Sequence, residues 1–181
     1  MSDVYYEFPV YVANAAHNGY LVHQAAYRLM LEPGKDCVRN FIFDLEGASD
    51  GTGLYALIRS KRIPTGATGI KVSPPEPGRY RFHLRAVTRK KNNINASTCA
   101  ERQIWLKQRA RVNGFELIGL PKLRTRTRNF SHHGRCFRIV ETVFSGLIEV
   151  VDPGRFHRVW RDGIGDQKGF GYGLISLYPA A

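Results

Sequence analysis

Two side chains that can move protons lie three positions apart near the start of a predicted helix, Tyr20 and His23. An imidazole titrates near neutral pH, so it can transfer a proton to or from a ribose 2′-hydroxyl or a 5′ leaving oxygen. A phenol one helical turn away can hydrogen-bond to a phosphate oxygen or orient the nucleophile. Surface Tyr/His pairs are also common without a catalytic role, so this spacing alone fits either an RNA-cleaving pair or an ordinary surface pair.

Arginine recurs at every second position of one predicted strand, at Arg124, Arg126 and Arg128. Because successive side chains of a strand point to opposite faces, the three guanidinium groups should form one cationic face. A turn at residues 131–134 would return Arg135 and Arg138 beside them. Since the opposite face offers only threonines and a leucine, too little for a core, we expect a projecting hairpin whose arginines bind RNA phosphates or guanine edges. A solvated edge strand protected by its charge is the alternative.

Glycines dominate residues 163–174, a segment that also carries Lys168. Glycine adopts positive φ and lets another molecule approach the backbone amides. We therefore expect Gly165 and Gly171 to present amides to an RNA phosphate that Lys168 also contacts. A flexible turn before the last strand fits the glycine spacing equally well. A dinucleotide fold is disfavoured, because its glycine-rich turn follows an early strand and opens a helix.

The 181-residue chain has 27 Lys and Arg against 15 Asp and Glu, a formal net charge of +12. This excess attracts polyanions, so nucleic acid is the first partner to expect. Further RNA contacts are expected from six cations elsewhere in the chain: Arg28, Arg81, Arg85, Lys90, Lys91 and Lys122. Arg81 and Arg85 share the polar face of an alternating strand, which suits a phosphate backbone or is simply solvated. No basic amphipathic helix or long apolar segment indicates a membrane partner.

Metal and disulfide chemistry are not indicated by the cysteines and histidines. Cys37, Cys99 and Cys136 are scattered, odd in number and not paired as C-x-x-C, which gives the adjacent His132 and His133 poor metal-ligand spacing. This spacing fits neither a disulfide framework nor a zinc site, so we expect no metal and no cofactor. The first residues carry acids where a signal peptide needs positive charge, which predicts a cytoplasmic protein.

The elements that must position these residues follow a repeated order. Strands are predicted at 4–12, 41–46, 54–59, 79–87, 115–118, 121–130, 137–151 and 175–178, and helices at 20–30, 100–110 and 155–161. Prolines and glycines between residues 60 and 78 leave no room for a full helix. The order predicts an α+β chain of tandem ferredoxin-like (RRM-like) domains, residues 1–92 and 93–181, the first with a shortened or missing second helix.

The chain also resembles the CasE-type CRISPR repeat-RNA endoribonucleases of Cascade complexes. Five motifs carry the resemblance in order along the chain: Tyr20 with His23, Arg81 to Ala86, Trp105-Leu106 with Gly114-Phe115, Glu149 to Pro153, and Gly163 to Leu174. Together they span most of the sequence and are far more specific than any one of them. The resemblance implies tandem ferredoxin-like domains and catalytic roles for His23 and Tyr20.

The resemblance further implies cleavage of pre-crRNA at the 3′ base of the repeat stem-loop. The expected reaction is metal-independent attack by the 2′-hydroxyl, which leaves a 2′,3′-cyclic phosphate. Members of the family often keep the crRNA hairpin as subunits of an effector complex, beside a backbone protein. Two alternatives stay open: a non-catalytic subunit that only holds the stem-loop, and a processing subunit of a type IV complex. A generic RRM-like module is disfavoured by the lack of adjacent aromatic-rich strands.

Overall fold

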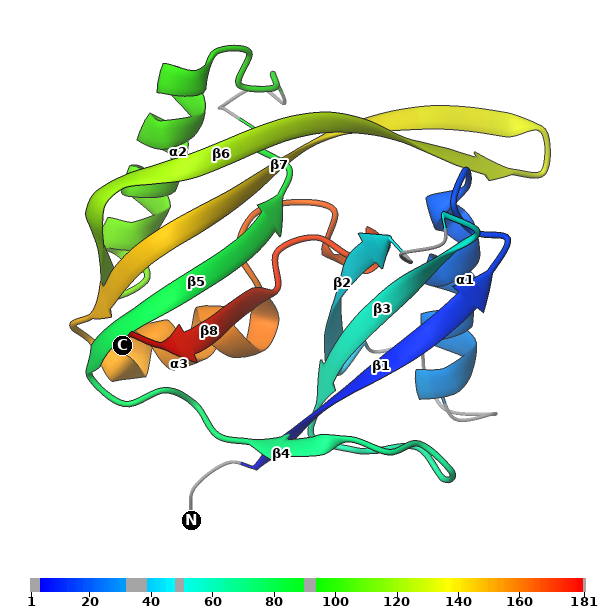
Figure 1. Ribbon diagram of the computed structural model, residues 1–181, viewed down its shortest axis with the longest axis horizontal. Helices are drawn as coiled ribbons and strands as arrows, with labels where there is room; N and C mark the ends of the chain where they lie inside the picture. The colour runs from blue at the N-terminus through cyan, green and yellow to red at the C-terminus, as the bar shows by residue number, and fades with distance from the viewer. Residues whose placement is uncertain (1–3, 32–38, 48–50, 90–93, 181) are drawn as a thin grey trace.

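The computed structural model describes residues 4–31, 39–47, 51–89 and 94–180. It contains two four-stranded antiparallel sheets, each with helices on one face (Figure 1). The first half contains β1 (Tyr5–Ala13), α1 (Gly19–Met30), β2 (Phe41–Gly47), β3 (Gly53–Ser60) and β4 (Ile70–Val72). The second half contains β5 (Gly78–Ala86), α2 (Cys99–Val112), β6 (Phe115–His132), β7 (Arg135–Val150), α3 (Pro153–Asp162), the 3-10 turn η2 (Lys168–Phe170) and β8 (Ile175–Pro179).

The strand orders are β2-β3-β1-β4 in the first sheet and β6-β7-β5-β8 in the second. Both are the ferredoxin-like order, in which the first strand lies between the third and the fourth. Described residues 61–69 form no helix between β3 and β4, whereas α2 and α3 complete the second half. The predicted fold class is therefore confirmed, including the missing second helix of the first half.

One strand belongs to a different sheet from the one that its position in the sequence suggests. Residues 79–87 were expected at the end of the first domain, but β5 pairs with β7 and β8 as the central strand of the second sheet. Phe82 and Leu84 of β5 face a core built with α2 and α3. Local alternation identifies a strand but not its partners, which depend on long-range packing. The expected boundary at residues 92/93 therefore does not coincide with the change of sheet, which lies between Val72 and Gly78.

Local signals position α1, the helix that carries Tyr20 and His23. Asn18 caps it by accepting a hydrogen bond from the Tyr20 amide, as expected of an N-cap asparagine. Val22 and Ala26 are fully buried against the first sheet, so the opposite face, with Tyr20 and His23, is directed away from that sheet. The site described below therefore lies on the helical side of the first half.

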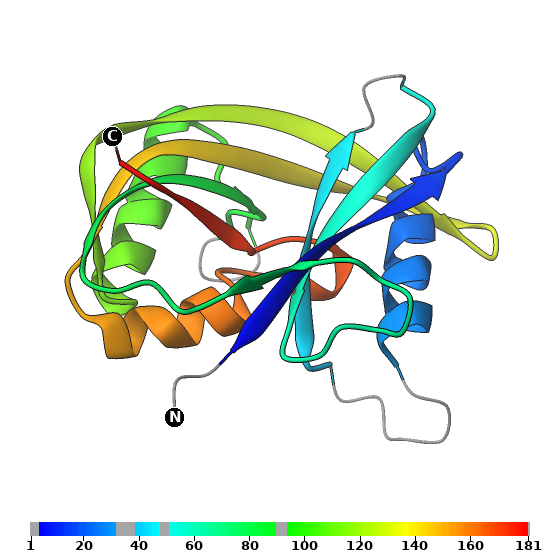
Figure 2. The same ribbon diagram turned by 60° about the horizontal axis from the view of Figure 1, so that its bottom comes forward.

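A long β6–β7 hairpin links the two halves. It continues past Thr142, the last residue of β7 that pairs with β5, and its far end lies beside α1 in both views (Figures 1 and 2). Phe130 and Ile139 near its tip are buried in the core of the first half. A Cβ on Gly19 would lie 2.7 Å from the Phe130 ring, so glycine permits this close approach.

Arg59 fixes the two halves against each other. Its buried guanidinium group donates to Glu7 of the same sheet, to the Trp160 carbonyl of α3 at 2.8 Å and to the Ile175 carbonyl of β8 at 3.1 Å. It also lies 4.0 Å from the centre of the Trp160 ring. Among the helices that the structure describes, none combines the length and apolar character needed to cross a bilayer.

Candidate functional site

Tyr20 and His23 are half-buried in a cluster of rings on the side of α1 that faces away from the first sheet. Their ring centres are 5.1 Å apart, and Tyr27 lies 4.4 Å from His23 one turn further along. Phe170 of η2 stacks on His23 at 4.9 Å and contacts Phe130 of the hairpin at 5.4 Å. The helix, the glycine-rich segment and the hairpin therefore meet at His23.

A backbone carbonyl determines which nitrogen of His23 is available. Nδ1 of His23 lies 2.7 Å from the carbonyl oxygen of Gly169. Because a carbonyl oxygen can only accept, Nδ1 carries the hydrogen and donates it. The neutral imidazole then has its lone pair on Nε2, to which no group in the described part of the chain hydrogen-bonds. Nε2 is therefore placed to accept a proton, or to donate one when the ring is charged.

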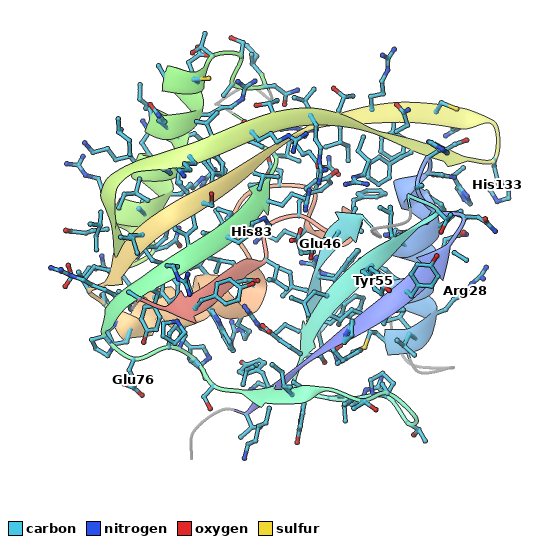
Figure 3. All side chains as sticks on the ribbon, in the orientation of Figure 1. Arg28, Glu46, Tyr55, Glu76, His83 and His133 are labelled. Carbon is cyan, nitrogen blue, oxygen red and sulfur yellow. The ribbon has the colours of Figure 1, made fainter. Side chains whose placement is uncertain are left out.

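The hairpin tip places a second imidazole, that of His132, beside Tyr20, and the sequence analysis did not assign this residue to the site. His132 stacks on Tyr20 with ring centres 4.1 Å apart and an interplanar angle of 24°. Figure 3 shows its neighbour His133 at the tip of the hairpin. From the sequence, both histidines are expected only as part of a turn. Nothing local reveals that a turn more than a hundred residues after α1 docks on its first turn.

The glycine-rich segment serves packing more than phosphate binding. Gly171 is buried with φ +85°, and a Cβ there would lie 2.6 Å from Leu45. Its amide donates to the Lys168 carbonyl at 3.3 Å, so in this structure that N–H already has a partner within the chain. Gly165, with φ +83°, lies over the Trp105 ring and is half-buried. Lys168 is half-buried too, and this burial, together with Arg39, lowers its pKa.

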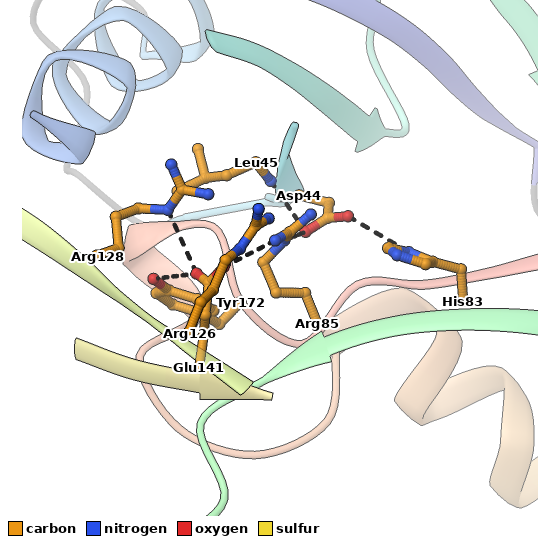
Figure 4. Close-up of polar contacts among 8 residues, drawn as sticks. All are labelled: Asp44, Leu45, His83, Arg85, Arg126, Arg128, Glu141 and Tyr172. Carbon is orange, nitrogen blue, oxygen red and sulfur yellow. Dashed lines mark hydrogen bonds and ion pairs between the residues drawn. The ribbon is translucent and has the colours of Figure 1, made fainter. Parts of the chain in front are cut away.

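Arg85 belongs to a buried ion network rather than to the RNA surface. Its Nε donates to Asp44 of the first sheet at 2.8 Å, and another of its nitrogens donates to Glu141 of β7 at 2.9 Å (Figure 4). Its residue exposure is 3%, so in this structure two carboxylates rather than solvent surround the guanidinium group. Arg81 and Arg85 do share one face of the strand, but residues of the other half cover that face at Arg85.

Two arginines of the hairpin also turn toward Glu141. Arg126 donates to it, and Nε of Arg128 lies 3.3 Å from its Oε2. The face that carries these arginines continues into the buried Phe130, whereas Thr125 and Thr127 are exposed. The predicted projecting hairpin is present, and on its arginine face Arg126 and Arg128 pair with Glu141 while Arg124 and Arg126 remain exposed. The threonine face is indeed too small for a core, and Phe130 on the arginine face supplies the packing instead.

The electrostatics of this network follow from burial and charge. Glu141 loses hydration, which raises its pKa, but Arg85, Arg128 and Arg126 outweigh this and lower the pKa to about 2. Its carboxylate also accepts from the Tyr172 hydroxyl at 2.9 Å. The pKa of Asp44 is raised, because desolvation exceeds the opposing effects of Arg85 and His83. The carboxylate of Glu141 is thus the charge that holds the arginines together.

The other predicted RNA contacts fall into two groups. The exposed cations are Arg28 on α1, Arg81 on β5 and four hairpin residues, Lys122, Arg124, Arg135 and Arg138. Lys90 and Lys91 lie outside the described residues. Nowhere in the described part of the chain do three or more His, Cys, Asp or Glu side chains gather as metal ligands.

Comparison with known proteins identifies the family. The profile of a family described as CRISPR associated protein matches residues 9–179. The chain belongs to this family. The predicted resemblance to CasE-type proteins is thereby confirmed, since the curated relatives include the Cascade subunit CasE of Escherichia coli K12, 26% identical over 185 residues that cover 88% of this chain and 92% of CasE.

Another member of the family is the CRISPR-associated endoribonuclease Cse3 of Thermus thermophilus. It is 30% identical over 134 residues, and the match covers 60% of this chain and 64% of Cse3, just under two thirds of that protein. A solved structure of Thermus thermophilus Cse3, bound to an RNA representing a pre-cleavage complex, has a TM-score of 0.75 and 25% identity over 97% of this chain and 99% of that one. This match extends the family likeness to the arrangement of both halves.

Proposed function

We propose that this chain is a pre-crRNA processing endoribonuclease that cleaves at the 3′ base of the repeat stem-loop. The observation that carries the proposal is the free Nε2 of His23, held beside Tyr20 by the Gly169 carbonyl, next to a hairpin rich in arginine. Membership in a family that includes the endoribonuclease Cse3 supports the same activity. The proposed setting is the cytoplasm, where the repeat transcript is made.

The proposed reaction is a transesterification within the RNA and needs no metal ion. The ribose 2′-oxygen attacks the adjacent phosphorus, the bond to the 5′ oxygen breaks, and the upstream product keeps a 2′,3′-cyclic phosphate. His23 transfers a proton in this step, and the Tyr20 hydroxyl hydrogen-bonds to a phosphate oxygen. A ribonucleotide carries its own nucleophile, so correctly placed proton donors and acceptors are sufficient for the reaction.

The RNA surface that we propose combines exposed and paired cations. Arg135, Arg138 and Arg124 are exposed along the hairpin, whereas Arg126 and Arg128 approach the stem from fixed positions beside Glu141. Guanidinium groups held in place lose less side-chain entropy on binding phosphate. After cleavage, the chain stays on the crRNA hairpin and joins other effector-complex subunits, including a backbone protein. Membership in the family of the Cascade subunit CasE supports this assembly.

Cleavage of the chain's own repeat RNA tests the proposal. We expect a stem-loop RNA to be cut once, at the 3′ base of its stem, in the presence of excess EDTA. The upstream fragment should resist labelling at its 3′ end until the cyclic phosphate is removed. A matched RNA with a single 2′-deoxy nucleotide at the scissile position should bind without being cut. Binding of both RNAs with no cleavage of either would favour the stem-loop-holding alternative.

The cations of the hairpin predict a strong salt dependence of RNA binding. Each phosphate neutralised should contribute about −0.7 to −0.9 to the slope of log affinity against log salt concentration. Replacing Arg135 or Arg138 by glutamine should therefore make the slope shallower by roughly that amount per residue. Arg155→Gln, an exposed arginine on α3, is the matched control and should leave the slope unchanged. Fluorescence anisotropy at salt concentrations between about 50 and 300 mM measures the affinity from which this slope is obtained. Equal slopes for all variants would contradict the hairpin surface.

A further inference from the structure

The hairpin tip is fixed to the first turn of α1 by hydrogen bonds in both directions. Nδ2 of Asn18 donates to the Ser131 carbonyl at 3.0 Å, and the Ser131 amide donates to Oδ1 of Asn18 at 3.0 Å. Oδ1 of Asn18 also accepts from the Tyr20 amide at 3.1 Å. The same side chain therefore caps the helix and holds the residue next to His132. This places the His132 ring relative to Tyr20 through the backbone of both elements.

The Tyr20 ring contacts two imidazoles, one from each element. His132 stacks on it at 4.1 Å, and His23 lies 5.1 Å from it. In the described part of the chain no group hydrogen-bonds to the ring nitrogens of His132, and the residue is half-buried. Stacking occupies the face of this ring and leaves its edge, where the nitrogens are, for another molecule. A phosphodiester that reaches Tyr20 and His23 would therefore meet both imidazoles.

We infer that His132 is a second proton-transfer residue of this site, one that accepts the proton of the 2′-hydroxyl while His23 gives a proton to the 5′ oxygen. The inference rests on the proposed RNA-cleaving function and deepens it. Two geometric observations support it. The hairpin tip is fixed to α1 by hydrogen bonds, and the Tyr20 ring contacts two imidazoles that come from separate elements. A single imidazole would have to perform both transfers in succession.

The atoms of the step balance with these two residues alone. The bond from the 2′-oxygen to phosphorus forms as the 2′-hydroxyl proton passes to the neutral His132. The bond from phosphorus to the 5′ oxygen breaks as protonated His23 gives that oxygen the proton on Nε2. His23 keeps its hydrogen on Nδ1, donated to Gly169. Exchange with water then restores both rings, so no metal, oxidant or further reactant is required.

The charges around His132 favour the neutral ring that this role needs. The groups that face it are Tyr20 and His23 from α1, and its hairpin neighbours His133 and Arg135. Desolvation lowers the pKa of His132, and His133 and His23 lower it further. A lowered pKa leaves more of the ring unprotonated at neutral pH. Arg135, its cross-strand partner, is a cation that can stabilise the charge developing on the phosphate.

Two substitutions separate proton transfer from ring stacking. His132→Phe keeps a ring that can stack on Tyr20 but removes the nitrogens, and His132→Ala removes both. We expect both variants to cleave the repeat RNA at least about 10²-fold more slowly in a single turnover, as general-base loss implies. Both should still bind the 2′-deoxy RNA. His133→Asn is the matched control, because His133 has φ +46° and asparagine tolerates that conformation. It should retain nearly full activity.

An RNA with sulfur in place of the scissile 5′ oxygen assigns the two roles, since a thiolate departs without being protonated. His23→Ala should regain much of its rate on this RNA, whereas His132→Phe should stay slow. Full activity of His132→Phe on the ordinary RNA would overturn the inference and leave His132 as a stacking residue. Recovery of His132→Phe on the sulfur RNA would overturn its role as base. If the unsubstituted protein cleaves nothing, the proposed function itself fails, which is a distinguishable result.

Discussion

Replacing His23 by alanine should slow RNA cleavage by about 10²–10⁴-fold, the range that general acid–base catalysis contributes, while RNA affinity changes little. The reason is that in the proposed function His23 transfers a proton through Nε2, whereas the exposed cations of the hairpin bind the RNA. Single-turnover rates with repeat RNA measure the first effect. Equilibrium binding of the 2′-deoxy RNA measures the second. Loss of rate with retained affinity would identify a residue of the chemical step.

His23→Asn is the matched variant for this experiment. Its side-chain amide can still donate to the Gly169 carbonyl from nearly the position of Nδ1, but it has no group that transfers protons. It should be as slow as His23→Ala if His23 acts on the substrate. An active His23→Asn would mean that the histidine only holds the glycine-rich segment against α1. The same assays should be run with Tyr27→Phe, which keeps the neighbouring ring and should be close to wild type in rate.

Local sequence signals were sufficient to predict α1 and the proximity of Tyr20 and His23. The asparagine cap and the 3.6-residue period of Val22 and Ala26 identified the helix and its exposed face. Tyr20 and His23 lie three residues apart on that face, so their proximity follows from helix geometry alone. The order of elements also predicted the ferredoxin-like fold of both halves. For α1 and its two side chains the information is local, because backbone geometry decides which neighbouring side chains meet.

Contacts between distant segments could not be predicted in this way. The alternation in β5 is the same whether Arg85 faces water or a carboxylate from another strand, so the sequence could not show that Asp44 and Glu141 bury it. The same limit hid the pairing of Arg126 and Arg128 with Glu141, and the packing of Phe130 on the same face into the other half. It also hid His132 and the Gly169 carbonyl. All of these are contacts between residues far apart in the sequence, which form only when the chain folds.

The burial of Glu141 nevertheless connects these pairings to the site. Its carboxylate accepts from Arg85, Arg126 and Arg128, and also from Tyr172, which lies next to the buried Gly171. The hairpin, the glycine-rich segment and β5 therefore all contact the same carboxylate, that of Glu141. Because η2 supplies the Gly169 carbonyl and the hairpin supplies His132, this charge supports the two segments that complete the site around α1.

Replacing Glu141 by glutamine should lower the free energy of unfolding at neutral pH by about 3 kcal/mol, the cost of removing one of the two carboxylates that pair with the buried Arg85 and the one that Arg126 and Arg128 share. The carboxylate side chain has no exposed surface, and Arg85 beside it is also buried. Urea unfolding followed by tryptophan fluorescence measures the loss. Glu149→Gln on the same strand is the matched control, because the Glu149 side chain keeps 41% of its surface exposed and lies 3.8 Å from Arg79. It should change stability by less than about 1 kcal/mol.

The difference between wild type and Glu141→Gln should itself depend on pH. The pKa of Glu141 is about 2 in the folded chain, below its ordinary value of 4.5. A lowered pKa means that the carboxylate stabilises the fold fully above its ordinary value, and that this contribution disappears as pH falls toward the folded pKa. The difference in free energy of unfolding between the two proteins should therefore be constant from about pH 7 to about 5 and decrease steadily below pH 5. A gap that persists undiminished at about pH 3, near the lower end of that window, would show that the charge of Glu141 is not what stabilises the network.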